Sequence, residues 1–131
     1  MNKALEIHDS TPNEIKKEGL YVTLCLGKAI MHHSIGEPGV DKGTCWTQQV
    51  EIRLENSQIL NEPNDIPNQL DYGYLVVNDT KYTNVIKTPL QESAEIEVSF
   101  ETFSGSELRI KSKSIEITEI GKPEYLQDFE Q

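Results

Sequence analysis

The chain has 131 residues, of which 36% are hydrophobic and 26% are charged, and its formal net charge is −10 at pH 7. This composition excludes a disordered chain and predicts one globular domain over residues 1–131. The negative charge argues against a nucleic-acid-binding protein, because contacts with phosphates need a basic face.

The N-terminal segment and the apolar runs bear on the location of the protein. Residues 1–8 lack the continuous apolar core of a signal peptide, and no apolar run approaches the roughly 18 residues of a membrane span. We therefore expect a cytoplasmic protein without membrane contact. In a reducing cytoplasm Cys25 and Cys45 are expected to be free thiols, and no cysteine–histidine spacing indicates zinc or another cofactor.

Apolar and polar residues alternate over most of the chain, and turn residues separate the runs. A period of two is typical of β-strands that bury one face. We therefore expect an all-β protein with little helix, folded as an antiparallel β-sandwich or flattened barrel of about nine or ten strands. The segments that can supply these strands are, in chain order, residues 4–8, 13–18, 20–26, 29–33, 45–55, 58–60, 72–77, 82–86, 94–101, 108–111 and 114–120.

The same alternation predicts which side chains are buried and which are exposed. Outward glutamates of 94–101 are expected to face outward Arg and Lys side chains of 108–111. After Pro123 we expect a short tail in which Tyr125, Leu126 and Phe129 cap an open end of the core. The side chains expected on buried faces are Leu20, Val22, Leu24, Leu26, Trp46, Gln48, Val50, Ile52, Leu54, Ile96, Val98, Phe100, Leu108, Ile110, Ile115 and Ile117.

The segment from His32 to Gln49 gathers much of the unusual chemistry of the chain. It holds two of the three histidines, the single tryptophan and one of the two cysteines. Its central loop, residues 34–44, is rich in glycine and longer than an ordinary hairpin loop, which is typical of functional loops. If the loop binds a ligand, we expect the binding residues to be His8, Asp9, His32, His33, Glu37, Asp41, Trp46 and Gln48.

The order of Gly27, His32, His33, Glu37 and Gly43 resembles that of cupin-type metal sites. Adjacent histidines on a strand, however, point to opposite faces of the sheet. At most one of them can therefore join Glu37, and two ligands do not hold a metal. We expect no metal site.

Three further interpretations stay open at this level. Cys45 acts as a nucleophile with His32 or His33, or it is a small packing residue. The segment 8–10, His-Asp-Ser, is a turn, or its His–Asp pair lies beside the glycine-rich loop. Gln48 bonds the backbone of that loop, or it lines the mouth of a cavity.

Residues 32–48, read as H-H-S-I-G-E-P-G-V-D-K-G-T-C-W-T-Q, and residues 120–126, read as I-G-K-P-E-Y-L, resemble segments of a group of small uncharacterised bacterial all-β proteins. More distantly, a short acidic chain of alternating strands resembles the β-rich immunity proteins of bacterial polymorphic toxin systems. These resemblances imply a β-fold. They bring no catalytic or binding residues that can be carried over to this chain.

We expect a non-catalytic binding or interaction module, with immunity-like protein binding as one form of it. The acidic charge suits a basic protein partner, and no catalytic set is assembled in the sequence. The alternative is a small-molecule or metal-dependent enzyme with its site in the 32–48 region. Because Lys16 and Lys17 protect the edge strand at 13–18, a monomer or a weak homodimer is expected.

Overall fold

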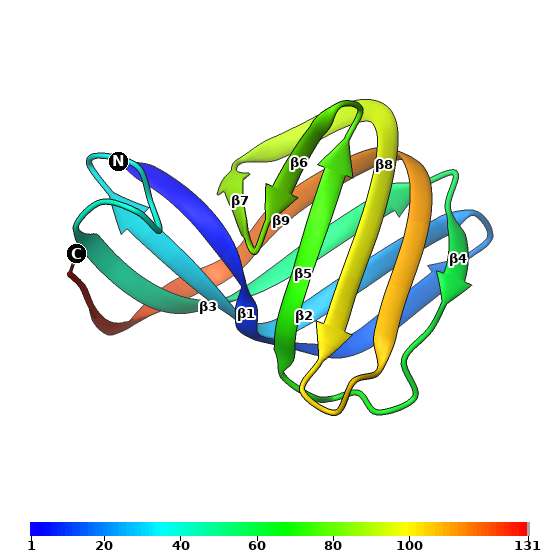
Figure 1. Ribbon diagram of the computed structural model, residues 1–131, viewed down its shortest axis with the longest axis horizontal. Helices are drawn as coiled ribbons and strands as arrows, with labels where there is room; N and C mark the ends of the chain where they lie inside the picture. Colours follow the sequence, from blue (N-terminus) through cyan, green and yellow to red (C-terminus); the bar gives the residue numbers. More distant parts are fainter. Residues whose placement is uncertain (131) are drawn as a thin grey trace.

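A computed structural model of the protein describes residues 1–130 and contains nine antiparallel strands in one open sheet, with no helix in that range (Figure 1). This confirms the prediction of an all-β antiparallel protein with about nine or ten strands. Those residues form no helix of the length and hydropathy that crossing a membrane requires. The strands are β1 (Asn2–Glu18), β2 (Tyr21–Ser34), β3 (Gly43–Glu55), β4 (Gln58–Asn61), β5 (Leu70–Val77), β6 (Thr80–Thr83), β7 (Val85–Thr88), β8 (Leu90–Thr102) and β9 (Glu107–Phe129).

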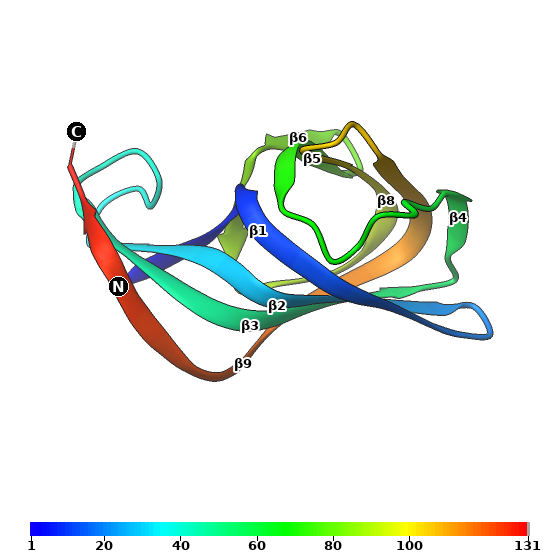
Figure 2. The same ribbon diagram turned by 90° about the horizontal axis from the view of Figure 1, so that it is seen from below.

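The sheet curves until its two ends approach each other. Its strands follow the order β6-β5-β8-β9-β3-β2-β1-β7, and β4 pairs with β9 off this path. The end strands β6 and β7 are neighbours in the chain, although β6 pairs with β5 and β7 pairs with β1. As a result β5, β6 and β8 lie across from β1, β2 and β3, as Figure 2 shows from below.

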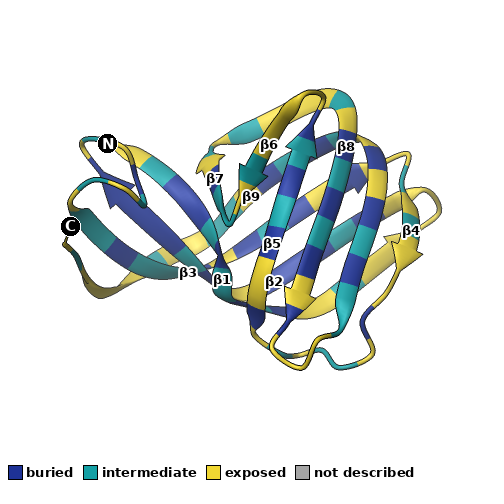
Figure 3. Ribbon diagram, viewed as in Figure 1, coloured by how far each residue is buried: buried dark blue, intermediate teal, exposed yellow. Residues whose placement is uncertain are grey.

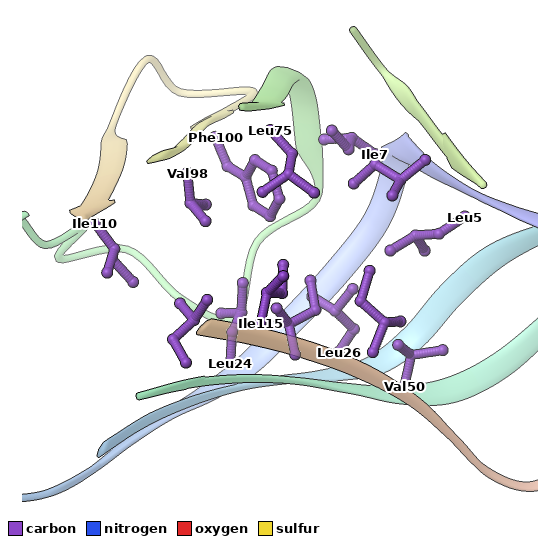
Figure 4. Packing of buried hydrophobic residues seen from close by; sticks show 14 of the residues in the cluster. Leu5, Ile7, Leu24, Leu26, Val50, Leu75, Val98, Phe100, Ile110 and Ile115 are labelled. Atoms are coloured by element: carbon purple, nitrogen blue, oxygen red, sulfur yellow. The ribbon is translucent and has the colours of Figure 1, made fainter. Parts of the chain in front are cut away.

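The hydrophobic core fills the space between these two halves of the sheet. Buried residues alternate with more exposed ones along β3, β5 and β8, as the sequence pattern requires, whereas β2 is buried on both faces at residues 24–26 and 31–34 (Figure 3). Ile7, Leu24 and Val50 of one half face Leu75, Val98 and Phe100 of the other (Figure 4). Each large apolar side chain that is fully buried contributes about 1.5–3 kcal/mol, so this layer supplies most of the driving force for folding.

Most of the predicted burial is confirmed, and four residues differ. Leu20 is exposed, because it belongs to the turn between β1 and β2 rather than to the strand. Trp46 is only partly buried, and Cys25 and Cys45, which the alternation places on the outer faces of their strands, are buried. Outside the core, Glu97 pairs with Arg109 at 3.3 Å, which confirms the predicted pairing of outward charges between these segments. Glu95 pairs with Lys113, which lies beyond the predicted segment.

In three places, consecutive segments that the sequence pattern predicts as separate strands form one continuous strand that contains a bulge. β1 joins 4–8 to 13–18, β2 joins 20–26 to 29–33, and β9 joins the last two predicted strands to the tail. Shifts of register between Leu26 and Ala29, and opposite Gln48, mark the extra residues. A bulge lets a strand continue past residues that otherwise indicate a turn, which is why the sequence pattern divides these strands.

Four strand segments extend beyond the β5–β8 half of the sheet, which lies to the right in Figure 1. We call this extension, made of residues 1–6, 29–49 and 119–129, the arm. The expected tail belongs to it: residues after Pro123 pair with β3 instead of capping the core. Tyr125 and Leu126 are 55% and 49% exposed, so the predicted cap is wrong for these two side chains.

Asn84 links the two ends of the sheet between β6 and β7. Its backbone N–H donates to Gly73 O in β5 at 2.9 Å, and its own carbonyl accepts from Ile7 N in β1 at 2.7 Å. Its side-chain Oδ1 accepts from His8 N at 2.8 Å. Asn84 has a φ of 61°, a left-handed conformation that asparagine tolerates better than most residues.

We expect Asn84→Ala to lower the free energy of unfolding by about 2 kcal/mol, roughly half from the left-handed backbone and half from the lost acceptor of His8 N–H. Equilibrium urea unfolding measures this loss. Asn84→Gly should lose only the acceptor term, and Asn84→Asp, which keeps the acceptor, should lose least. Equal stability of the Ala and Asp variants would show that the side chain does not join the ends.

Candidate functional site

The two adjacent histidines of β2 contact different groups on the arm. His32 contacts Glu6, Cys45 and Phe129, whereas the ring of His33 stacks on Trp46. They project to opposite faces because successive side chains alternate along a strand. The histidines therefore belong to two separate clusters.

His32 lies at the centre of a buried chain of polar groups. Its Nε2 is 2.8 Å from Glu6 Oε1, and its Nδ1 is 3.6 Å from Cys45 Sγ. His32 and Cys45 are each 3% exposed, and the ring of Phe129 packs edge-on against the imidazole with centroids 5.0 Å apart. Register places this group, because Ala4 pairs with His32, which in turn pairs with Cys45.

The glycine-rich loop covers His32. A methyl group on Gly39 would lie 3.3 Å from Val85 Cγ1 and 3.9 Å from His32 Cδ2, so the loop backbone passes close over the ring. Ser34 Oγ donates to Lys42 O at 2.8 Å and fastens the base of the loop. The loop excludes solvent from the His32 cluster.

Glu37 and Asp41, both predicted ligands, hold the loop in shape. Glu37 N donates to Asp41 Oδ2 at 2.7 Å, and Asp41 N donates to Glu37 O at 2.8 Å. Asn2 Nδ2 donates to Gly36 O at 2.8 Å and ties the loop to β1. These bonds form a turn closed by the side chain of Asp41, and Glu37 takes part in the turn through its backbone N–H and C=O.

His33 lies in an aromatic stack on the other face of the arm. Its ring is 5.2 Å from the Trp46 ring at an interplanar angle of 21°, and Tyr125 meets Trp46 edge-on at 5.5 Å. Burial lowers the pKa of His33, and the charge of nearby Lys3 lowers it further, against the opposing charge of Glu119. His33 Nε2 is buried and has no hydrogen-bond partner among residues 1–130. The neutral imidazole is therefore the form that the fold accommodates.

The other predicted residues lie elsewhere. His8 Nδ1 is 2.7 Å from Asp71 O at the start of β5, and this hydrogen bond raises the pKa of His8. Asp9 is adjacent, with Oδ1 3.5 Å from His8 Nε2. Gln48 Nε2 donates to Gly121 O at 2.9 Å, so it bonds the bulge of β9 and not the glycine-rich loop. The structure does not bring His8, Asp9 and Gln48 together with either of the paired histidines.

The sequence patterns do not predict two polar features of the structure, one in the His32 cluster and one outside both clusters. Glu6 follows the ordinary alternation of β1, and nothing local indicates that it faces His32. The second is a network around Asp65, whose Oδ2 accepts from Thr102 Oγ1 at 3.0 Å, from Asn68 Nδ2 at 3.1 Å and from Ser104 Oγ. These hydrogen bonds, that of Ser104 first, lower the pKa of Asp65. They anchor the irregular segment before β5 to the β8–β9 turn.

The order carboxylate, imidazole and thiol in the His32 cluster is one that thiol enzymes use. Two observations oppose that use here: Cys45 is buried, and burial followed by the charge of Glu6 raises the pKa of its thiol. Among residues 1–130, no group of three or more His, Cys, Asp or Glu side chains is arranged to hold a metal ion. The cluster is suited to packing and hydrogen bonding rather than to attack on a substrate.

The arm also borders a surface hollow of about 480 Å³. It lies between the start of β1, the glycine-rich loop and the residues that join β7 to β8. Of the predicted ligand-binding residues, Glu37 alone contributes to its lining, which comprises Met1, Asn2, Lys3, Gly36, Glu37, Pro38, Lys87, Thr88 and Pro89. The histidines and Trp46 do not open into it.

Comparison of the chain with protein-family models, with curated proteins and with solved structures finds no match. The resemblances stated from the sequence therefore stay predictions.

Because Cys45 is enclosed and its thiol is kept protonated, we expect a thiol reagent to modify it about 100-fold more slowly in the folded protein than in denaturant. A Cys25→Ser background isolates the Cys45 signal, and absorbance of the released chromophore gives both rates. A folded-state rate equal to or above the unfolded rate would instead identify an activated thiolate.

The lowered pKa of His33 makes stability depend on pH. Its unfolded pKa is near 6.5, so its neutral form is compatible with the fold above that pH, and stability is lost as the pH falls below it. Chemical unfolding of wild type and His33→Phe between about pH 7.5 and 5 tests this. The variant keeps an aromatic ring on Trp46, and the wild type should lose stability relative to it.

His8 provides the matched control for this experiment, because its raised pKa has the opposite sign. Its contribution to stability is present below pH 6.5 and is lost as the pH rises through its folded value. His8→Gln should therefore change the pH dependence in the reverse sense. If wild type and His33→Phe differ by the same amount at every pH, His33 is not held in its neutral form.

Proposed function

We propose that the protein is a non-catalytic protein-binding module whose partner binds on the arm. The observation that carries this proposal is the exposure of large apolar side chains there. Of the ten large apolar side chains that are exposed among residues 1–130, five belong to the arm: Met1, Ile35, Val40, Tyr125 and Leu126, with Ile35 91% exposed. The arm contains fewer than a third of the described residues, and a surface enriched in exposed apolar groups is typical of one that a partner covers.

The character of the arm supports binding rather than chemistry. The side chains capable of acid–base or nucleophilic chemistry, those of His32 and Cys45, are buried beneath the loop. The exposed side chains of Tyr125, Leu126 and Ile35, in contrast, are aromatic or aliphatic. Tyr125 is a suitable anchor because its ring packs against Trp46 and its hydroxyl donates a hydrogen bond to Asp128 Oδ1 at 2.6 Å. The net charge of −10 adds attraction for a basic protein. An immunity-like role, in which the partner is a toxin, is the form that the resemblance implies.

Affinity capture from an extract of the cells in which the protein occurs tests this function. Immobilised wild type should retain a protein that the double variant Tyr125→Ser, Leu126→Ser retains about tenfold less. The matched control is Tyr72→Ser, Leu60→Ser, which removes two side chains of similar exposure outside the arm and should bind as wild type does. The proposal fails if wild type retains no protein at low salt, or if all three chains retain the same proteins equally.

A further inference from the structure

The end of β9 has an open edge. β8 pairs with β9 as far as Leu90 and Ile117, and beyond that point β9 pairs with β3 alone among the described strands. A hollow of about 270 Å³ lies where β8 leaves β9, lined in part by Leu90, Ile117 and Glu119. No described strand occupies the position alongside residues 124–129.

The exposed edge of β1 carries the usual protection against strand addition. The free half of β1 contains Lys16 and Lys17, and Lys17 Nζ pairs with Glu62 Oε1 of a neighbouring loop at 2.8 Å. On β9 such protection ends with the bulge at Gly121 and Pro123. Residues 124–129 contain neither lysine nor proline.

The open segment is held rigidly from both faces. On one face Tyr125 rests against Trp46, and on the other Phe129 packs against His32. Its backbone pairs with β3 from Thr47 opposite Glu124 to Gly43 opposite Phe129. A strand fixed in this way offers its outward N–H and C=O groups without further ordering, which lowers the entropic cost of binding.

Charge selects the occupant of this edge. Glu124, Asp128 and Glu130 carry three carboxylates, and no cation lies between them in the sequence. A second copy paired antiparallel around Leu126 would place Glu124 opposite Asp128, and pairing around Gln127 would place Glu124 opposite Glu130. Like charges directly opposite each other destabilise a strand pair, so self-pairing is disfavoured and a basic strand is favoured.

We infer that the outer edge of β9 at residues 124–129 accepts an extended, lysine- or arginine-rich segment of the partner protein as an added β-strand. This inference rests on the proposed function and specifies how the partner is bound. Backbone hydrogen bonds to the edge provide the register, and the carboxylates provide the preference for basic side chains.

Synthetic peptides test the inference on the full, isotopically labelled protein. One peptide alternates Lys with Val and Thr, and its counterpart has Glu in place of each Lys. At millimolar concentration and low salt, the basic peptide should shift the backbone amide signals of residues 124–129 and slow their hydrogen exchange about tenfold. The acidic peptide should leave them unchanged, and added salt should weaken the effect.

A charge-reversed variant keeps the test independent of folding defects. Glu124→Lys with Glu130→Lys should abolish the response to the basic peptide and create one to the acidic peptide. Glu14→Lys with Glu18→Lys on the free half of β1 is the matched control and should respond as wild type does. Absence of amide protection by the basic peptide, the same preference after charge reversal, or protection of residues 124–129 by self-association would each overturn the inference.

The two proposals fail in different ways. If capture finds a partner that depends on Tyr125 and Leu126, but its binding is insensitive to the charge reversal and leaves the edge amides unprotected, strand addition is wrong and the binding function stands. If capture finds no partner that depends on the arm, the binding function itself is wrong.

Discussion

The hydrogen bonds around Asn84 are the constraint on which the arrangement of this protein depends. A nine-stranded antiparallel sheet can remain extended, and this one curves because a single residue connects the strand that ends it on one side with the strand that ends it on the other. Closure brings Ile7 of β1 close to Gly73 of β5, where a Cβ atom would lie 3.1 Å from Ile7 Cγ2 and 2.7 Å from Phe100 Cδ1. The absence of a side chain at Gly73 is therefore part of the same closure.

Closure of one part of the sheet leaves the arm as a different environment. There the strands extend past the β5–β8 half, so their apolar and polar groups are buried by the loop and the aromatic side chains of the arm itself. The glycine-rich loop covers His32, and the ring of Trp46, with Tyr125 against its edge, covers His33. The outer edge of β9 is open in the arm, because none of the described strands pairs with it there.

The candidate site illustrates what residue patterns can and cannot predict. That adjacent histidines face apart follows from strand geometry alone, and the contacts of His32 and His33 agree with it. From the sequence Cys45 is either a nucleophile with His32 or His33 or a small packing residue, and the structure places its Sγ 3.6 Å from His32 Nδ1 while enclosing the thiol. Glu6 could not be anticipated, since it reaches His32 through the register of β1 against β2. Glu37 and Asp41 suggested ligands by residue type, yet they bond each other's backbone.

The all-β class and most of the buried faces follow from the sequence alone, because alternation is a property of neighbouring residues. The tertiary structure sets where bulges join predicted strands into longer ones, how Asn84 closes the sheet, and which strand keeps an open edge. These features depend on register between segments far apart in the chain, and a single extra residue changes that register without altering the local pattern.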